Sequence, residues 1–299
     1  MVALSSPKFE IIGEQRDSLG ECPILSPDQS TLFWIDGEEP AAIQRLDITS
    51  GQVKRWTMPR RIGSFALAQG GGALVALQDG VSRFDFATGG IEPLARVEQP
   101  DHFFLNDGRC DRQGRFFVTT MNLAMLNGDR ASGPVYRLDA DGLVPVIDGI
   151  IAGNGMAFSP EGTTMYVGCS LQSTIWALDL DPDDGSLSNR RIFAVVDRPG
   201  CFLDGAAIDD DGCYWVCIYG AGLIERYTPD GRLDRVVELP VTRPTMLGMP
   251  NDPSAGTFVT SGRVSDRPGM KQLNMLDGSL LHVELAISGP PEPLARPVP

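Results

Sequence analysis

The stretch 154-NGMAFSPEGTTMYVG-168 contains the pattern that decides the fold. A short apolar strand leads into the turn Ser-Pro-Glu-Gly, and a second strand containing Tyr and Val follows. Two such strands around a glycine-containing turn predict a β-hairpin. The pattern recurs in residues 21–36, 64–78, 106–120 and 204–218, and more weakly in 246–261.

Each hairpin continues into a third strand, such as AIQRLD (42–47), TIWALDL (174–180) or LLHVEL (280–285), and then into a fourth. The first-turn markers, separated by 43, 43, 48, 50 and 44 residues, are Asp28, Gly71, Gly114, Gly162, Gly212 and Gly256. Four short strands per roughly 40–50 residues is the spacing of propeller blades, not of a sandwich or a β-helix. The sequence therefore predicts an all-β, six-bladed β-propeller with four antiparallel strands per blade, as a single domain over residues 1–299. Residues 9–13 (FEIIG) are expected to pair into the last blade and cover its open edge.

Charge and composition exclude several classes of partner. The formal net charge of −14 disfavours nucleic acid and anionic membrane surfaces. No run of 18 apolar residues and no signal peptide is apparent, so we expect a cytoplasmic protein without membrane contact. The six cysteines are scattered without a CxxC pair, which favours free thiols. Nothing in the sequence indicates the oligomeric state.

Polar residues recur at one position of the repeat, seven or eight residues before each first turn. Because the innermost strand of every blade lines the central axis, these side chains should converge. They are Glu21, Ser64, Asp107 with Asn106 beside it, Asn154 and Asp204; the sixth unit offers the stretch near Thr245 and Met246, ten or eleven residues before its marker. Carboxylate and amide oxygens suit hard divalent cations, and crowded carboxylates repel one another without a cation. Asp-Gly and Asn-Gly are also ordinary turn dipeptides, but Glu21 within Leu-Gly-Glu-Cys-Pro is not turn chemistry.

The same stretches resemble the regucalcin/gluconolactonase (senescence marker protein) family over essentially the whole chain. The resemblance is carried by LGECP (19–23), LNDGRCDRQGRFFVTTM (105–121), GNGMAFSPEGTTMYV (153–167) and LDGAAIDDDGCYWVCIYGAGLIERYTPDG (203–231). It implies a six-bladed propeller that acts as a metal-dependent lactonase. It also implies that Glu21, Asn154 and Asp204 are metal ligands and that Asn106 contacts substrate or metal-bound water. The ion would be one divalent metal (Ca²⁺, Mg²⁺, Mn²⁺, Zn²⁺ or Fe²⁺), which the sequence does not identify.

The chain departs from the family pattern around the substrate. Phe104 stands where sugar lactonases commonly carry an arginine, and Asn122 follows Thr120-Met121 where an acidic or polar contact is usual. Cys22 replaces the usual glycine after Glu21, and Cys201-Phe202-Leu203 replaces a common Tyr-Pro before the aspartate. We therefore expect an intact metal triad inside a more apolar substrate shell.

As a hypothesis, the metal polarises the carbonyl of a small lactone and Asp204 serves as both ligand and general base. His102 is a further candidate substrate contact, whereas His282 alternates with apolar residues like a strand side chain. Residues 179–191 differ from a calcium-binding loop, because Gly185 lies one position late and Arg190 occupies the twelfth position, where glutamate belongs. A hairpin turn is therefore favoured. Two other readings stay open: a non-catalytic binding module, and a metal-dependent phosphotriester hydrolase on the same scaffold.

Overall fold

The glycines that mark the first turns adopt the left-handed backbone conformation that such turns require. Gly71, Gly114, Gly162, Gly212 and Gly256 have φ between 73° and 102°. In the first unit, where the marker is an aspartate, the next residue (Gln29) takes this conformation with φ 59°. A side chain is disfavoured at positive φ, so the repeat of glycines reports six equivalent hairpins.

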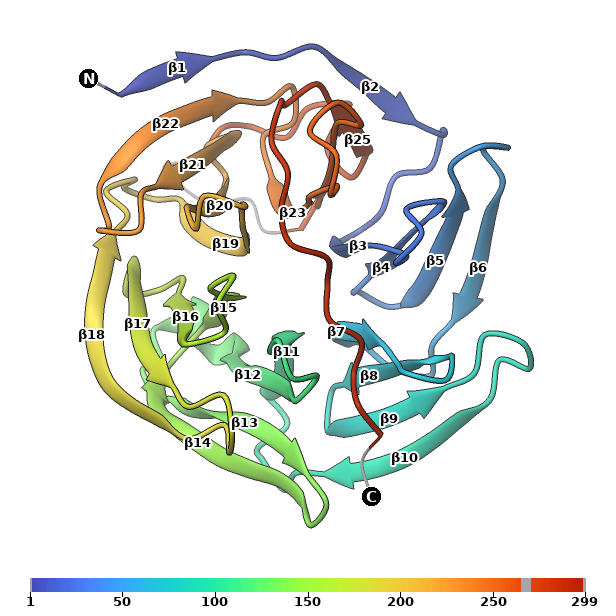
Figure 1. The fold of residues 1–299 in the computed structure, drawn as a ribbon, viewed down its shortest axis with the longest axis vertical. Coiled ribbons are helices and arrows are strands. Elements are labelled where there is room, and N and C mark those ends of the chain that lie inside the picture. Colours follow the sequence, from blue (N-terminus) through green and yellow to red (C-terminus); the bar gives the residue numbers. More distant parts are fainter. Residues whose placement is uncertain (1, 265–269, 298–299) are drawn as a thin grey trace.

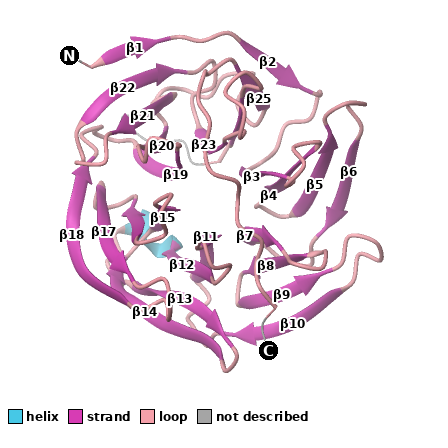
Figure 2. Ribbon diagram, in the orientation of Figure 1, coloured by secondary structure: helices cyan, strands magenta, loops and turns pink. Residues whose placement is uncertain are grey.

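The computed structural model describes residues 2–264 and 270–297, which form six four-stranded units around a central axis (Figure 1). This confirms the predicted six-bladed β-propeller. The strands are β3 (Gly20–Leu25), β4 (Thr31–Asp36), β5 (Ala42–Asp47) and β6 (Val53–Thr57) in blade 1; β7 (Ile62–Leu67), β8 (Ala73–Leu77), β9 (Gly80–Phe84) and β10 (Ile91–Arg96) in blade 2; β11 (Phe103–Cys110), β12 (Phe116–Asn122), β13 (Gly133–Asp139) and β14 (Gly142–Ile150) in blade 3; β15 (Gly153–Phe158), β16 (Thr164–Cys169), β17 (Thr174–Leu180) and β18 (Leu187–Val195) in blade 4; β19 (Phe202–Ile208), β20 (Tyr214–Tyr219), β21 (Leu223–Tyr227) and β22 (Leu233–Glu238) in blade 5; and β23 (Pro244–Gly248), β24 (Thr257–Ser261) and β25 (Leu280–Val283) in blade 6. Among the described residues the helical content is one short 3₁₀-helix, η1 (Leu123–Asn127) (Figure 2).

The N-terminal segment completes the ring. Strand β2 (Phe9–Ile12) pairs antiparallel with β25 and supplies the fourth strand of blade 6. Strand β1 (Ala3–Ser5) adds to the outer edge of blade 5 in parallel with β22. The two strands therefore link blades 5 and 6 from outside, and they cover edges that would otherwise be open to pairing with other chains.

The core consists of six apolar clusters, one between each pair of neighbouring blades. Adjacent aromatic residues on the second strands face opposite neighbours, because strand side chains alternate in direction. Phe116 packs towards blade 2 while Phe117 packs towards blade 4. Tyr214 and Trp215 divide in the same way between blades 4 and 6. The second-strand aromatics thus hold the blades together.

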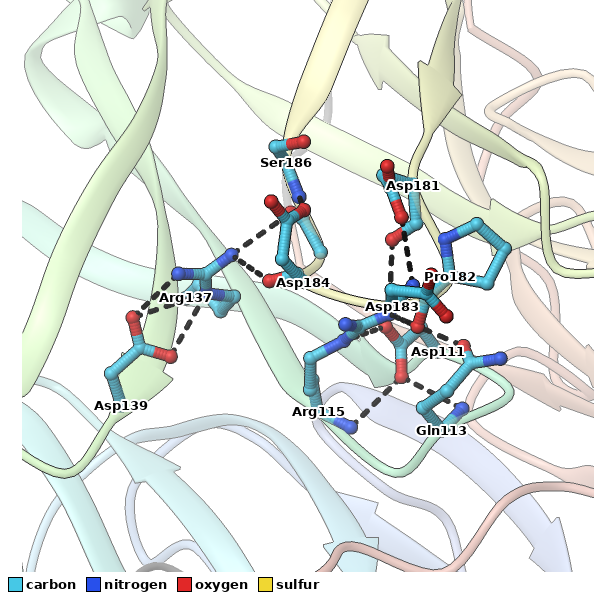
Figure 3. A network of polar contacts seen from close by, with 11 residues as sticks. Asp111, Gln113, Arg115, Arg137, Asp139, Asp181, Pro182, Asp183, Asp184 and Ser186 are labelled. Carbon is cyan, nitrogen blue, oxygen red and sulfur yellow. Dashed lines mark hydrogen bonds and ion pairs between the residues drawn. The ribbon is translucent and has the colours of Figure 1, made fainter.

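Two arginines of blade 3, the buried Arg115 and the half-buried Arg137, fix the hairpin at 181–186, the segment compared above with a calcium loop. Arg115 of blade 3 pairs with Asp111 at 2.5 Å and donates through Nη2 to the carbonyls of Asp181 and Pro182 in blade 4 (Figure 3). Arg137 similarly donates to the carbonyls of residues 184 and 185. The turn carbonyls therefore accept hydrogen bonds from guanidinium groups, as expected of a hairpin turn.

The C-terminal segment crosses the central axis, as Figure 1 shows for the red trace beyond β25. Its backbone bonds to turns that follow the innermost strands: Ser288 accepts from Asp210 of blade 5, and Ala295 pairs with Leu67 and Gln69 of blade 2. These turns lie at the C-terminal ends of the inner strands. The segment therefore covers one end of the axis and leaves access to the other.

No helix within residues 2–264 and 270–297 is long and apolar enough to cross a membrane. No disulfide joins the six cysteines, all of which lie in the described part of the chain; five are buried and Cys201 is half-buried.

Candidate functional site

Each innermost strand contains a register irregularity close to its N-terminal end. These irregularities follow Glu21 in β3, Leu105 in β11, Asn154 in β15 and Leu203 in β19, and β7 and β23 carry equivalents. A bulge redirects side chains at one point of a strand and is frequent beside functional sites. The repeated bulge explains why polar side chains at this position of the repeat leave the pleat and turn towards the axis.

A cavity of about 110 Å³ lies at this end of the axis, and this volume holds several water molecules. Its lining is Leu19, Glu21, Glu38, Arg61, Phe104, Asn106, Met121, Leu123, Met125, Leu126, Asn154, Ser170, Phe202, Asp204, Tyr219 and Val264. The three residues expected to bind metal therefore share one small cavity with Asn106 and Phe104. The size suits a small molecule.

The amide of Asn154 has a fixed orientation. Ser170 Oγ donates to the carbonyl of Leu203 at 2.7 Å, which uses its only proton. It must therefore accept from Asn154 Nδ2, which lies 3.1 Å away. Since the nitrogen is engaged with the protein, the Oδ1 atom of Asn154 is the one available as a metal ligand.

Burial, and to a smaller extent neighbouring carboxylates, raise the pKa of the acids Glu21 and Asp204. Burial raises the pKa of the Asp204 carboxyl well above its usual value, and the Asp107 carboxylate raises it further, against hydrogen bonds from Gly205 and Asn154. Burial likewise raises the pKa of Glu21, with further contributions from Asp204 and Asp107. Three acids thus share a desolvated space, which is costly without a compensating positive charge.

Asp107 lies behind the cavity and not in its lining. Its Oδ2 accepts a 2.7 Å hydrogen bond from the Met156 amide of the next blade. Its Oδ1 is buried and has no hydrogen-bond partner among the described residues. Burial raises the pKa of this carboxyl, while the Met156 amide and the guanidinium of Arg109 lower it.

The other polar residues at this position of the repeat connect neighbouring blades. Ser64 donates to the carbonyl of Asn106 at 2.7 Å, and Thr245 donates to the carbonyl of Gly20 at 2.5 Å. Asn106 donates through Nδ2 to the carbonyl of Gly153 at 2.9 Å, which leaves its Oδ1 without a donor in the protein among the described residues. Asn106 therefore combines, like Asn154, a fixed position with a free amide oxygen at the cavity.

The other residues expected to contact substrate divide into two groups. Phe104 is buried on β11 and lines the cavity. Asn122 is fully buried outside the lining, where its Oδ1 caps η1 by accepting from Ala124 and its Nδ2 donates to Asp129. His102 is exposed, outside the lining, with Nε2 3.8 Å from the same aspartate.

Sequence reasoning missed several lining residues. The end of β12 contributes Met121 to the apolar part of the lining, and the segment after β12 contributes Leu123, Met125 and Leu126. Its signal is Asn122, a good helix N-cap before a short apolar run, although five residues are too few for a helical period. Arg61 was also missed; it lies one residue before β7 and contacts Phe104.

The donor set fits a divalent cation. Within the described part of the chain no group of three or more His, Cys, Asp and Glu side chains is placed to hold a metal. The cavity instead offers the carboxylates of Glu21 and Asp204 and the amide oxygen of Asn154. This oxygen set suits Ca²⁺, Mg²⁺ or Mn²⁺ better than thiolate-preferring ions. A bound cation would also offset the repulsion among the buried acids.

Fold and site define a six-bladed propeller with an acidic, small-molecule cavity at one end of its axis. The model of the SMP-30/gluconolactonase/LRE-like region matches residues 19–263, and the chain belongs to this family. It is 32% identical over 292 residues to 6-deoxy-6-sulfogluconolactonase of Pseudomonas putida, covering 96% of this chain and 98% of that protein. It is 32% identical over 257 residues to L-arabinolactonase of Azospirillum brasilense, covering 85% and 84% of the two chains.

A solved structure has the same fold. The calcium-binding protein regucalcin from Agrobacterium tumefaciens superposes with a TM-score of 0.88 at 24% identity, covering 99% of this chain and 100% of that one. At this identity the likeness concerns the fold alone.

Proposed function

We propose that the protein hydrolyses a small lactone with one divalent metal ion held by Glu21, Asn154 and Asp204. The observation that carries the proposal is the shared cavity, in which the half-buried Glu21, the buried Asp204 and the oriented amide oxygen of Asn154 meet at the axis. The lactonase names of two relatives, each 32% identical, support the same reaction class. The calcium-binding description of the Agrobacterium structure agrees with the donor set.

The bound metal would supply Lewis-acid activation of the ester carbonyl and charge compensation. Asp204 would take a proton from the attacking water, because its carboxylate lines the cavity in which water and substrate would meet. Asn106, through Oδ1, would orient the water or a substrate hydroxyl. The oxygen of water forms the new bond to the carbonyl carbon, the ring C–O bond breaks, and the proton passes to the ring oxygen. The product is a hydroxy acid.

The apolar part of the lining bears on the substrate. Phe104, Met121, Leu123, Leu126 and Phe202 offer no hydrogen-bonding side chain to sugar hydroxyls. Among neutral lactones we therefore expect faster hydrolysis of apolar rings than of polyhydroxylated rings. A clear preference for glucono-1,5-lactone over apolar lactones would contradict this expectation.

The test is a pH-indicator assay on a lactone panel and one phosphotriester, with Mn²⁺ or Ca²⁺ and with chelator. We expect metal-dependent lactone hydrolysis, its loss in Asp204→Ala, and its retention in Asp211→Ala, whose side chain is 83% exposed. Circular dichroism should show both variants folded. Near wild-type turnover in Asp204→Ala would contradict the role assigned to Asp204. Activity on the phosphotriester alone would mean that the protein hydrolyses a phosphoester bond and not a lactone.

A further inference from the structure

One basic side chain, Arg61, lines the cavity among the described residues. It lies between β6 and β7, at the same end of the axis as the proposed metal ligands. The other charged residues of the lining are acids: Glu21, Glu38 and Asp204. With a divalent cation on Glu21 and Asp204, and with Glu38 beside Arg61, the lining would be close to neutral.

Two contacts hold the Arg61 guanidinium in place. Its Nη2 bonds to the carboxylate of Glu38 in blade 1. Its central carbon lies 4.5 Å from the centre of the Phe104 ring in blade 3, a cation–π arrangement. Phe104 is therefore a support for a cation as well as an apolar wall. This contact gives a physical reason for an aromatic residue at position 104.

The remaining donors of Arg61 have no acceptor among residues 2–264 and 270–297. Neither Nε nor Nη1 forms a hydrogen bond with a described residue, although the side chain is only 17% exposed. Donors that are largely withdrawn from solvent and lack an acceptor are costly. A guanidinium carries five N–H donors, so the bond to Glu38 leaves donors for the oxygens of a carboxylate, phosphate or sulfonate.

We propose that Arg61 binds an anionic substituent of the substrate, so that the protein prefers lactones carrying a carboxylate, phosphate or sulfonate away from the ester carbonyl. The proposal rests on the lactonase function proposed above and names its substrate class. The ester group would lie near Asp204 and the substituent near the Arg61–Phe104 pair. Arg61 is then a specificity-determining residue that takes no part in bond breaking.

The test compares matched lactones that differ only in the substituent on carbon 6: glucono-1,5-lactone and its 6-phospho and 6-sulfo derivatives. Arg61→Gln should lower kcat/KM for the anionic lactones by about 10- to 100-fold, mainly through KM, because a charged hydrogen-bonded pair is lost. The neutral lactone should change less than about threefold. Arg61→Lys keeps the positive charge but not the planar guanidinium with its several donors. Its loss of kcat/KM for the anionic lactones should therefore lie between these two values. The 6-phospho and 6-sulfo arms show which anion fits better.

The neighbouring arginine provides the control. Arg60 is 52% exposed, pairs with Asp79 and lies outside the lining. Arg60→Gln removes the same charge one residue away and should leave the ratio of anionic to neutral kcat/KM unchanged. Equal losses on both kinds of lactone in Arg61→Gln, no loss, or the same ratio change in Arg60→Gln would overturn the proposal.

A second measurement separates this proposal from the lactonase function. If the wild-type protein hydrolyses no lactone with any metal, the lactonase function fails, and calorimetric binding of 6-phosphogluconate and gluconate then tests Arg61. Tighter binding of the phosphorylated acid, lost in Arg61→Gln and kept in Arg60→Gln, supports an anion site at Arg61. Equal binding of the two acids, or none by the wild-type protein, overturns it.

Discussion

Asp204→Asn should stabilise the metal-free protein at neutral pH, although it removes a proposed metal ligand. Burial and the Asp107 carboxylate raise the pKa of Asp204 above its usual value of 3.8. The folded state therefore binds a proton more tightly than the unfolded chain, and the contribution of Asp204 to stability falls as pH rises above about 4. An asparagine has nearly the same shape and carries no charge at any of these pH values.

The size of the effect follows from the surroundings of the carboxylate. Like charges a few ångströms apart repel by about 2–4 kcal/mol at an effective dielectric constant near 20. The hydrogen bonds from Gly205 and Asn154 offset part of this repulsion. We expect Asp204→Asn to raise the free energy of unfolding by about 2 kcal/mol at pH 8, or Tm by about 4 °C, and by almost nothing below about pH 4. Thermal unfolding in chelator across pH 4–8 measures this difference.

Metal should reverse the order of stability. Saturating Mn²⁺ at about 100 times its Kd would stabilise the wild-type protein by about 2.7 kcal/mol and the variant much less. Asp209→Asn is the control, because Asp209 is also buried but bonds to Trp215 and Arg226. It should destabilise by about 1–3 kcal/mol with and without metal. A metal-free Asp204→Asn protein that is less stable than wild type at pH 8 would refute the reasoning.

Three further outcomes are expected. Arg115→Ala should lower the free energy of unfolding by about 3–5 kcal/mol in urea titrations, since it leaves the buried Asp111 carboxylate without its ion pair and removes the donor to the Pro182 carbonyl (Figure 3); a loss below about 1 kcal/mol would contradict this. Truncation after Ser288 should expose Cys22 and Cys110, which lie beneath the C-terminal segment, and speed their reaction with a thiol reagent; unchanged reactivity would contradict that covering role. Asn154→Ala should weaken Mn²⁺ binding about 10-fold or more in calorimetry through the lost oxygen ligand, and unchanged affinity would remove Asn154 from the ligand set.

The repeat made the ring of polar residues predictable. Equivalent positions in a propeller must converge, so counting back from the turn glycines placed Glu21, Asn154 and Asp204 together before any side-chain position was known. Counting did not show which members of the ring face the cavity. Ser64 and Thr245 occupy equivalent positions, yet their hydroxyls donate to the backbone of a neighbouring blade. That choice depends on inter-blade contacts that no strand pattern records.

The loops of the site were less predictable than its strands. Asn122 caps a single helical turn that brings Met125 and Leu126 to the cavity, and five residues carry too little periodicity to predict this. Arg60 and Arg61 are adjacent and chemically identical, so the sequence alone does not indicate which one lines the cavity. The answer depends on Glu38 and Phe104, which come from two other blades.

The central claim is that three oxygen-bearing side chains from three blades bind one cation at the end of the axis. Its most direct test is an anomalous difference map from crystals grown in millimolar Mn²⁺. The account predicts one strong peak about 2.1–2.6 Å from oxygen atoms of Glu21, Asn154 and Asp204. A map with no peak in this cavity, or with the ion bound elsewhere, would contradict it.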